Sequence, residues 1–325
     1  MAKDVGVPAY NRHSPLSPEF MRAAEKMQEA RSALKDVIIG QDNVIDLTLE
    51  AILSGGHVLL NGMPGLGKTR LAKATGQVLG LNQGRIQFVP DLMPSNIVGS
   101  EILHETVQDN HVERSFEFLK GPVFCQLLLA DEINRANPRT QAAMLESMEE
   151  KRVTDNGKHY DLDPLFTTLA TQNPAEEGEG TYPLPAAQRD RFRIRIDVKD
   201  LTLEEELKIL DMSLYGDQTL HLPSVFDANE GNNHELSTIR RLVEEEVVIP
   251  EDVKIYAAKI MHGARPHSSD SPAFIKEKFN PGASGTRSGQ AMLKMARAHA
   301  LIEGRAVVNY DDITRVVIPT LIHRL

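Results

Sequence analysis

The segment Gly62–Thr69 carries the most specific chemical signal in the sequence. Its residues fit the pattern G-x-x-x-x-G-K-[ST], with an apolar run before them and a helical pattern after them. Glycines at these positions let backbone N–H groups turn toward anionic oxygens at the positive start of a helix. We expect Lys68 to reach the β- and γ-phosphates of a nucleotide and Thr69 to ligate Mg²⁺. The candidate nucleotide-binding residues are Gly62, Pro64, Gly65, Leu66, Gly67, Lys68, Thr69 and Arg70.

A second signal is the pair of acids Asp131 and Glu132, which follows the apolar run 126–130. Ligands of open α/β sheets bind at the carboxyl ends of the strands. We therefore expect Asp131 to hold Mg²⁺ through water and Glu132 to polarise an attacking water. A protein that only bound phosphate would need no second carboxylate there, so Glu132 favours hydrolysis.

Three further polar residues are candidate site residues because of their order along the chain. Asn173 ends the next apolar run, where its amide could bind the attacking water or the γ-phosphate. By itself, an asparagine before a proline is about as often a plain turn residue as a functional one. Arg191 follows Asp190, a combination that is usually a surface ion pair. Arg287 lies in the first turn of a helical pattern, where a lone arginine is usually solvated.

These residues need a framework of alternating strands and helices. Helical spacing of apolar residues predicts helices, and short continuous apolar runs predict buried strands. Their alternation predicts a parallel sheet covered by helices on both faces. The predicted strands are 57–60, 85–89, 126–130 and 166–170, and the predicted helices are 18–36, 41–54, 68–79 and 138–150. Two polar inserts, about 101–119 and 151–165, are predicted hairpins that turn at Asp109-Asn110 and Asn156-Gly157.

The pattern becomes all-helical after about Lys199, with predicted helices at 202–214, 235–247, 251–264, 287–303 and 310–322. Residues 1–18 hold three prolines and no apolar periodicity, which predicts a flexible tail. We therefore predict a tail at 1–18, an α/β core at 19–198 and a helical domain at 199–325.

Composition narrows the class of protein. The 325 residues are 41% hydrophobic and 25% charged, which excludes a wholly disordered or fibrous chain. A net charge of −10 disfavours binding that depends on covering nucleic acid with positive charge. One cysteine, Cys125, excludes an intramolecular disulfide framework and fits a reducing compartment. Without a signal-peptide core or an apolar run near the roughly 18 residues that span a bilayer, we expect a cytoplasmic protein and no membrane insertion.

The succession of phosphate loop, Asp-Glu strand end, Asn strand end, Asp-Arg-Phe and late helical arginine resembles an AAA+ ATPase. More narrowly, the chain resembles the MoxR family over about residues 25–325. Several of the blocks that carry this resemblance are narrow to the family rather than to AAA+ at large. The blocks are Val37–Gln41, Gly55–Leu59, Arg85–Phe88, Pro90–Ser95, Ala130–Ala136, Leu169–Pro174, Gly180–Pro185 and Leu321–Arg324.

The resemblance implies an α/β fold, with an AAA+ P-loop NTPase core (a parallel sheet between helices) and a C-terminal all-helical lid domain. It implies an ATPase that converts ATP and water to ADP and phosphate with Mg²⁺, in a homo-oligomeric, hexameric ring. Asn173 would be the first sensor, Arg191 the arginine finger acting on the neighbour's nucleotide, and Arg287 the second sensor. The two inserts would face the ring pore. The residues bordering the adenine would be Val37, Ile38, Ile39 and Gly40.

The sequence departs from the family pattern in two places. The family commonly has an acidic residue and an aliphatic one before Asp-Arg-Phe, where this chain has Ala186 and Arg189. Arg189 is therefore a rival of Arg191 for the finger. The segment Pro281–Thr286 ends in glycine and threonine where a proline is often seen, which affects the start of the lid helix more than the assignment of Arg287.

The resemblance favours chaperone-like remodelling or maturation of client proteins with a von Willebrand factor A-domain partner. No such domain follows the lid in this sequence, so we expect a separate partner protein. One alternative is a nucleic-acid motor, to which the basic hairpin residues Lys151, Arg152, Lys158 and His159 could contribute. Another is the motor subunit of a metal-insertion chelatase. The histidines lack HExxH-type spacing, and a small-molecule kinase is the least favoured function.

Overall fold

The computed structural model describes residues 16–108, 111–174, 180–214, 222–227, 234–278 and 285–324. Most of the predicted tail, the predicted turn at Asp109-Asn110 and residues 281–284 lie outside the described residues. No helix in these ranges is long and apolar enough to cross a bilayer.

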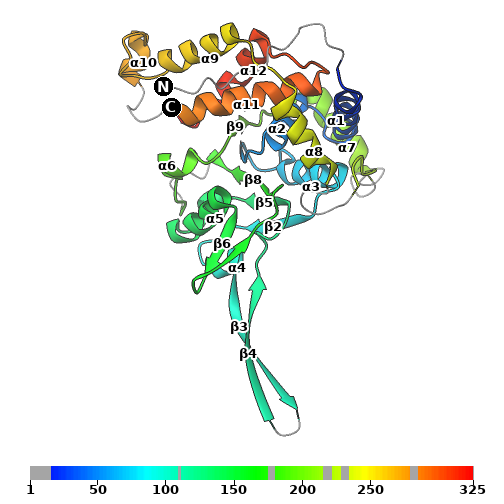
Figure 1. Cartoon of the computed structure of the whole chain (residues 1–325), viewed down its shortest axis with the longest axis vertical. Helices are drawn as coiled ribbons and strands as arrows, with labels where there is room; N and C mark the ends of the chain where they lie inside the picture. Colours follow the sequence, from blue (N-terminus) through cyan, green and yellow to red (C-terminus); the bar gives the residue numbers. More distant parts are fainter. Residues whose placement is uncertain are drawn as a thin grey trace, which may run out of the picture.

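A five-stranded parallel sheet forms the centre of the molecule, in the order β2-β5-β8-β1-β9 (Figure 1). Four strands correspond to predicted ones, although β2 begins two residues before the predicted range. The fifth, β9, was not predicted because its short Ile-Arg-Ile-Asp run alternates apolar and charged residues. The bounds are β1 Val58–Asn61, β2 Gln83–Gln87, β5 Leu127–Asp131, β8 Thr167–Gln172 and β9 Ile194–Asp197.

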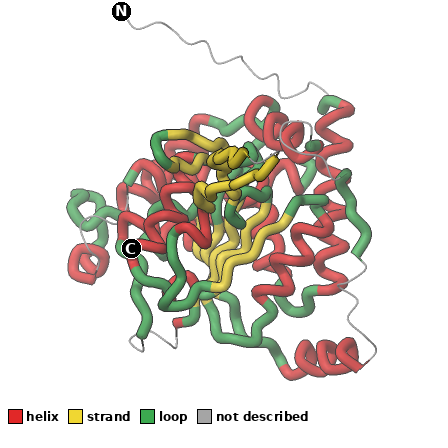
Figure 2. Tube along the Cα trace, turned by 90° about the horizontal axis from the view of Figure 1, so that it is seen from below, coloured by secondary structure: helices red, strands yellow, loops and turns green. Residues whose placement is uncertain are grey.

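Helices cover both faces of this sheet, as predicted (Figure 2). Successive side chains of a strand point to opposite faces. Leu60 and Leu129 accordingly pack with the residues of one apolar cluster, and Leu59 and Leu128 with those of the other. The first cluster includes α1 (Pro18–Val37), α2 (Asp42–Leu53) and α3 (Lys68–Val78). The second includes α4 (Ser95–Val98) and α5 (Pro138–Glu150).

Identifiable residues determine where α5 begins and ends. Asn137 caps α5 by accepting a hydrogen bond from the Thr140 amide at 3.1 Å, and Pro138 occupies the first turn, where it has no amide to satisfy. The helix ends at Lys151, whose φ of +51° turns the chain out of helical geometry. Both ends of α5 are therefore fixed by identifiable residues.

The two predicted inserts are hairpins that contact each other. β3 (Gly99–Gln108) and β4 (His111–Lys120) form a long antiparallel ribbon that projects from the body in Figure 1. β6 (Arg152–Asp155) and β7 (Lys158–Asp161) form the shorter one. Tyr160 stacks on Phe118 with ring centroids 4.0 Å apart, and Lys158 Nζ lies 2.8 Å from Glu101 Oε1. The short hairpin thus supports the base of the ribbon.

Beyond residue 200 the described chain is helical. Five helices match predictions and α10 was not predicted. The bounds are α7 Leu203–Leu214, α8 Glu235–Glu245, α9 Glu251–Gly263, α10 Ala273–Lys278, α11 Thr286–Ile302 and α12 Tyr310–Leu321. Buried residues of α8, α9, α11 and α12 join the cluster of α1, α2 and α3. The division at 198–200 therefore stays a prediction, while the α/β fold with a helical C-terminal region is confirmed.

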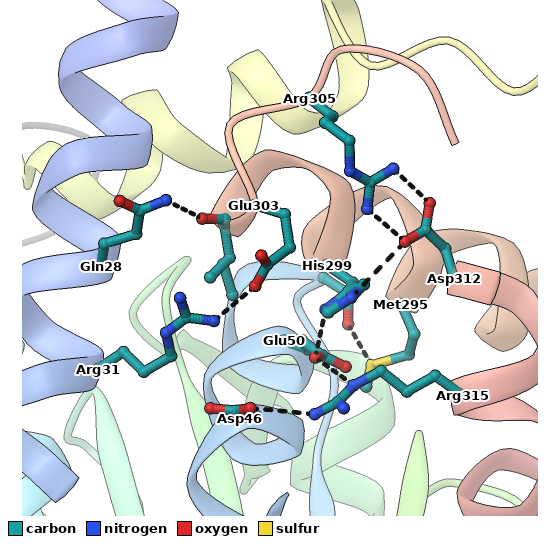
Figure 3. Close-up of polar contacts among 12 residues, drawn as sticks. Gln28, Arg31, Asp46, Glu50, Met295, His299, Glu303, Arg305, Asp312 and Arg315 are labelled. Atoms are coloured by element: carbon teal, nitrogen blue, oxygen red, sulfur yellow. Dashed lines mark hydrogen bonds and ion pairs between the residues drawn. The ribbon is translucent and has the colours of Figure 1, made fainter. Parts of the chain in front are cut away.

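A buried polar network fixes α11 and α12 against α2 (Figure 3). His299 lies between two carboxylates, with Nδ1 2.9 Å from Glu50 Oε1 and Nε2 3.6 Å from Asp312 Oδ1. Arg315 Nε donates to Glu50 at 3.2 Å, and Arg305 Nη2 donates to Asp312 at 2.5 Å. Glu50 is fully buried, so its carboxylate needs these partners.

Candidate functional site

A cavity of about 370 Å³ lies at the carboxyl ends of β5 and β8 and beside the loop that follows β1. It brings together most of the predicted phosphate loop, the acidic pair and the predicted sensor asparagine. The described lining consists of Pro64, Gly65, Gly67, Lys68, Thr69, Arg70, Asp131, Glu132, Thr171 and Asn173. Gly62 and Leu66 belong to the same loop but do not contribute to this lining.

The loop after β1 has the conformation that its glycines allow. Gly65 and Gly67 have φ values of +89° and +76°, in the left-handed region that disfavours other residues. Gly67 is also the N-cap of α3, so the unsatisfied amides of that helix start beside the cavity. Lys68 Nζ donates to the carbonyl of Gly62 and, at 3.1 Å, to that of Met63. The segment therefore offers amides and one ammonium group to an anion.

Asp131 ends β5 and accepts three hydrogen bonds. Its Oδ2 accepts from the Thr69 hydroxyl at 3.3 Å and from Arg85 Nη2 at 3.0 Å. Its Oδ1 accepts from the Thr171 hydroxyl at 2.7 Å. The side chain is mostly buried, and these donors hold the carboxylate beside the first turn of α3. The two residues predicted to hold Mg²⁺ are thus in direct contact.

Glu132 lies in a strained backbone conformation. Its φ of +57° and ψ of +50° are left-handed, a region that costs a residue with a Cβ roughly 1 kcal/mol or more. Its amide donates to the Thr171 hydroxyl at 2.8 Å. Its carboxylate accepts from Gln87 Nε2 at 2.7 Å and lies 3.2 Å from Arg135 Nε. This strained turn directs the carboxylate away from the strand and into a set of donors.

Four contacts at this site were not predicted from the sequence: Arg85, Gln87, Arg135 and Thr171. Arg85 and Gln87 are two residues apart on β2, and they reach the acidic pair because β2 lies beside β5. Their spacing places both on one face of a strand, but the neighbouring strand cannot be deduced from spacing. All four residues lie in blocks that resemble the MoxR family, but the resemblance gave none of them a role at the site.

Asn173 follows β8 and is buried, with 4% of its surface exposed. It lines the cavity together with Asp131 and Glu132, so the structure brings the ends of β5 and β8 together. The amide is therefore placed where it can contact a bound ligand.

A second cavity, of about 290 Å³, contains the predicted finger and second sensor. It is lined by residues just before β1, just before β9 and at the end of α5, together with Arg287, Gln290 and Arg324. In a parallel sheet these are the amino ends of the strands, the edge opposite the phosphate loop. The four residues of β1 alone separate the two edges by about 13 Å. Neither Arg191 nor Arg287 lines the first cavity.

Both arginines bind one carboxylate in this second cavity. Arg191 Nε donates to Glu149 Oε2 at 2.8 Å, and Arg287 Nη2 donates to Glu149 Oε1 at 2.7 Å. Arg287 Nη1 also lies 3.4 Å from Asp190 Oδ2. The hydrogen bond with Arg287 lowers the pKa of Glu149 and raises the pKa of Arg287. Arg189, the rival for the finger, ends α6 (Ala186–Arg189) and does not line this cavity.

The last described residues of the chain hold the turn that carries Arg191. Arg324 Nη2 donates to the carbonyl of Phe192 at 2.7 Å, and His323 Nε2 lies 3.1 Å from the same oxygen. Burial lowers the pKa of His323 to about 3, so the ring is neutral and its Nε2–H donates to that carbonyl. The closing Leu321–Arg324 block therefore has a structural task at the turn before β9.

The residues predicted to border the adenine lie beside the segment that links β9 to α7 and beside the first turn of α7. Gly40 has a φ of +74°, and a Cβ there would approach Glu205 Cδ to 2.6 Å. Gln41 Nε2 donates to the carbonyl of Lys199 at 3.0 Å. Val37, Ile38, Ile39 and Gly40 do not line the phosphate cavity, and their role stays a prediction.

Comparisons with known proteins agree with this geometry. The model of the ATPase family associated with various cellular activities (AAA) matches residues 57–194, and the model of the AAA lid domain matches residues 273–325. The chain is 35% identical to Chaperone MoxR1 of Mycobacterium tuberculosis, over 92% of this chain and 75% of that protein. It is 29% identical to Protein MoxR of Paracoccus denitrificans, over 92% of this chain and 88% of that protein. A crystal structure from Cytophaga hutchinsonii superposes with a TM-score of 0.82 at 34% identity, covering 94% of this chain and 88% of that one.

Proposed function

Because the chain belongs to the MoxR family of AAA+ ATPases, we propose that it hydrolyses ATP at the interfaces of a homo-oligomeric, hexameric ring. The observation that carries this proposal is the separation of Arg191 and Arg287 from the phosphate loop. In one subunit the arginines and the phosphate loop lie at opposite edges of the sheet, which supports a role of the arginines at a neighbour's site.

The first cavity would hold ATP and its cation. Lys68 and the amides of the loop bind the β- and γ-phosphates. The Thr69 hydroxyl and the Asp131 carboxylate present oxygen atoms 3.3 Å apart, a donor set that suits Mg²⁺, which in such sites is usually held by one or two side chains together with phosphates. When bound, the ion neutralises phosphate charge. The described residues contain no cluster of three or more His, Cys, Asp or Glu that would suit another metal.

Glu132 would accept the proton of the attacking water. Its position depends on Gln87 and Arg135, which hold the carboxylate, and on the strained backbone that points it out of β5. Asn173 would orient the same water or the γ-phosphate from the end of β8. These residues act within the subunit that binds the nucleotide.

Arg191 and Arg287 would act on the nucleotide of the next subunit. Two guanidinium groups aimed at the γ-phosphate stabilise the charge of the transition state, and an arginine finger contributes about 10³–10⁵ in rate in related NTPases. An isolated subunit should therefore turn over ATP very slowly. Assembly is in this account a part of catalysis.

Hydrolysis would drive chaperone-like remodelling or maturation of client proteins in the cytoplasm, with a von Willebrand factor A-domain protein as the partner. The M. tuberculosis relative is named as a chaperone, which supports proteins as the clients. The β3–β4 ribbon and the β6–β7 hairpin would face the pore. The β6–β7 hairpin gives little support to nucleic-acid binding. Two of its cations are already paired with acids, Lys158 with Glu101 and Arg152 with Glu150.

Mixing two inactive variants tests the shared site. Arg191→Ala subunits keep the phosphate loop, and Lys68→Ala subunits keep the arginines. In randomly mixed rings about a quarter of the interfaces combine the two intact halves, so ATP turnover should recover toward about a quarter of the wild-type value. If rings shown to contain both subunits stay as inactive as either variant alone, the arginines do not act on a neighbour.

A further inference from the structure

One side chain connects the two arginines of the second cavity. Glu149 lies in the last turn of α5, and each of its oxygens accepts a hydrogen bond from a different guanidinium, at 2.8 Å from Arg191 and at 2.7 Å from Arg287. The three side chains come from three separate parts of the chain, and all three line the same cavity. Through Glu149, Arg191 of the core thus contacts the same side chain as Arg287 of the C-terminal helical region.

Electrostatics explains why an acid is needed at this point. Lys151, Arg193 and Arg324 line the same cavity, and only Asp190 adds a second carboxylate to the lining. Two guanidinium groups brought together here repel each other and their cationic neighbours. Each also loses side-chain entropy when it is fixed. A carboxylate between them offsets the repulsion and holds both in one geometry.

The backbone that carries Glu149 is firmly placed. The amide of Lys151 bonds to the carbonyl of Ser147 at 3.0 Å and closes the last turn of α5. The other end of the helix is capped by Asn137, shortly after the turn that carries Glu132. Glu149 therefore presents its carboxylate from a rigid element rather than from a loop.

We propose that Glu149 is a positioning residue that holds Arg191 and Arg287 side by side and releases them to the γ-phosphate bound by the neighbouring subunit. This inference rests on the proposed function, since it assumes that the arginines act between subunits. Glu149 itself makes no contact with the nucleotide of its own subunit, because it lies at the other edge of the sheet.

The variant Glu149→Ala separates positioning from folding and from nucleotide binding. Turnover in assembled rings should fall at least about tenfold, because the arginines lose their alignment. The Kd for ATP should stay unchanged, and so should the urea midpoint, because partly exposed ion pairs contribute little to stability. Glu149→Asp, which keeps the charge, should restore part of the turnover. The matched control is Glu150→Ala, which removes an exposed carboxylate paired only with Arg152 in the described contacts and should leave turnover unchanged.

A mixing experiment identifies the subunit in which Glu149 acts. Glu149→Ala subunits have an intact phosphate loop, so mixed rings with Lys68→Ala subunits should recover turnover as Arg191→Ala mixtures do. Recovery with Arg191→Ala but not with Glu149→Ala would overturn the positioning role and leave the shared site standing. Failure of both mixtures would overturn the shared site and this inference with it. Wild-type or raised turnover of Glu149→Ala alone would also contradict the inference.

Discussion

Arg324 Nε donates to Asp190 Oδ1 at 2.7 Å and ties the end of the described chain to the residue before Arg191. The Arg324 side chain is only 3% exposed, and its other nitrogens donate to the carbonyls of Thr320 at 2.5 Å and Phe192 at 2.7 Å. The last turn after α12 therefore fixes the turn before β9. A residue far along the sequence sets the position of the proposed arginine finger.

Replacing this buried cation should destabilise the protein. Arg324→Met removes the buried donor to Asp190 Oδ1 and to the carbonyls of Thr320 and Phe192, and we expect the free energy of unfolding to fall by about 2–4 kcal/mol. Urea unfolding of the purified protein measures this. The matched control is Arg241→Ala, an arginine of α8 that is 52% exposed and should cost less than about 1 kcal/mol. Equal, small effects of the two substitutions would show that the Asp190 contact is not structural.

The phosphate loop can be tested by nucleotide affinity alone. Lys68→Ala removes the ammonium group of the first cavity and should raise the Kd for ATP at least about tenfold, the loss expected for a charge-assisted hydrogen bond. Titration with a fluorescent ATP analogue measures it. Lys73→Ala, on the exposed surface of the same helix, should bind normally. Unchanged affinity in Lys68→Ala would refute the assignment of the loop.

The role of Glu132 predicts a split between binding and turnover. Glu132→Gln keeps the size and hydrogen-bonding capacity of the side chain but cannot accept the proton of water. We expect normal ATP affinity and a turnover reduced at least about 100-fold, measured as phosphate release. Glu146→Gln, an exposed acid on α5, is the control. Normal turnover in the Glu132 variant means that another group is the base.

Two buried histidines make stability depend on pH. His57 Nδ1 accepts from the Thr168 amide at 2.9 Å, and burial lowers the pKa of His57 to about 3, as it does for His323. The unfolded chain takes up a proton below about pH 6.5 while the folded protein does not, so each histidine weakens folding as the pH falls from 6.5 toward 3. Each histidine lowers the free energy of unfolding by about 1.5 kcal/mol between pH 6.5 and pH 5.

The variant His57→Gln should remove one of these contributions. Its free energy of unfolding should fall less steeply than that of the wild type over the same pH range, whatever its absolute stability. Urea unfolding at pH 6.5, 6.0, 5.5 and 5.0 measures the two slopes. Parallel slopes would show that His57 is not held neutral in the folded protein.

The sequence predicted the elements whose signal is local. Continuous apolar runs identified β1, β5 and β8, and the phosphate loop and acidic pair were located by their own spacing. The strand β9 was missed because Arg195 interrupts its apolar residues. Gln87 reaches Glu132 only because β2 lies beside β5, and strand order is a property of the whole fold.

The same reason limited the prediction for the arginines. Arg191 and Arg287 were identified through the family resemblance, but their shared partner Glu149 was not predicted, because nothing in the predicted helix 138–150 indicates that the two arginines lie beside it. Which edge of the sheet they occupy follows from the direction of β1 and β9 in space. Long-range geometry of this kind has no signature in residue spacing.

The central claim, that one active site needs two subunits, is tested most directly by turnover during dilution. ATPase rate per subunit and particle mass by light scattering would be measured on the same samples, from high to low protein concentration in saturating ATP. The account predicts that both fall together as particles approach the 36.0 kDa of a single chain. Undiminished turnover per subunit in solutions of single chains would contradict it.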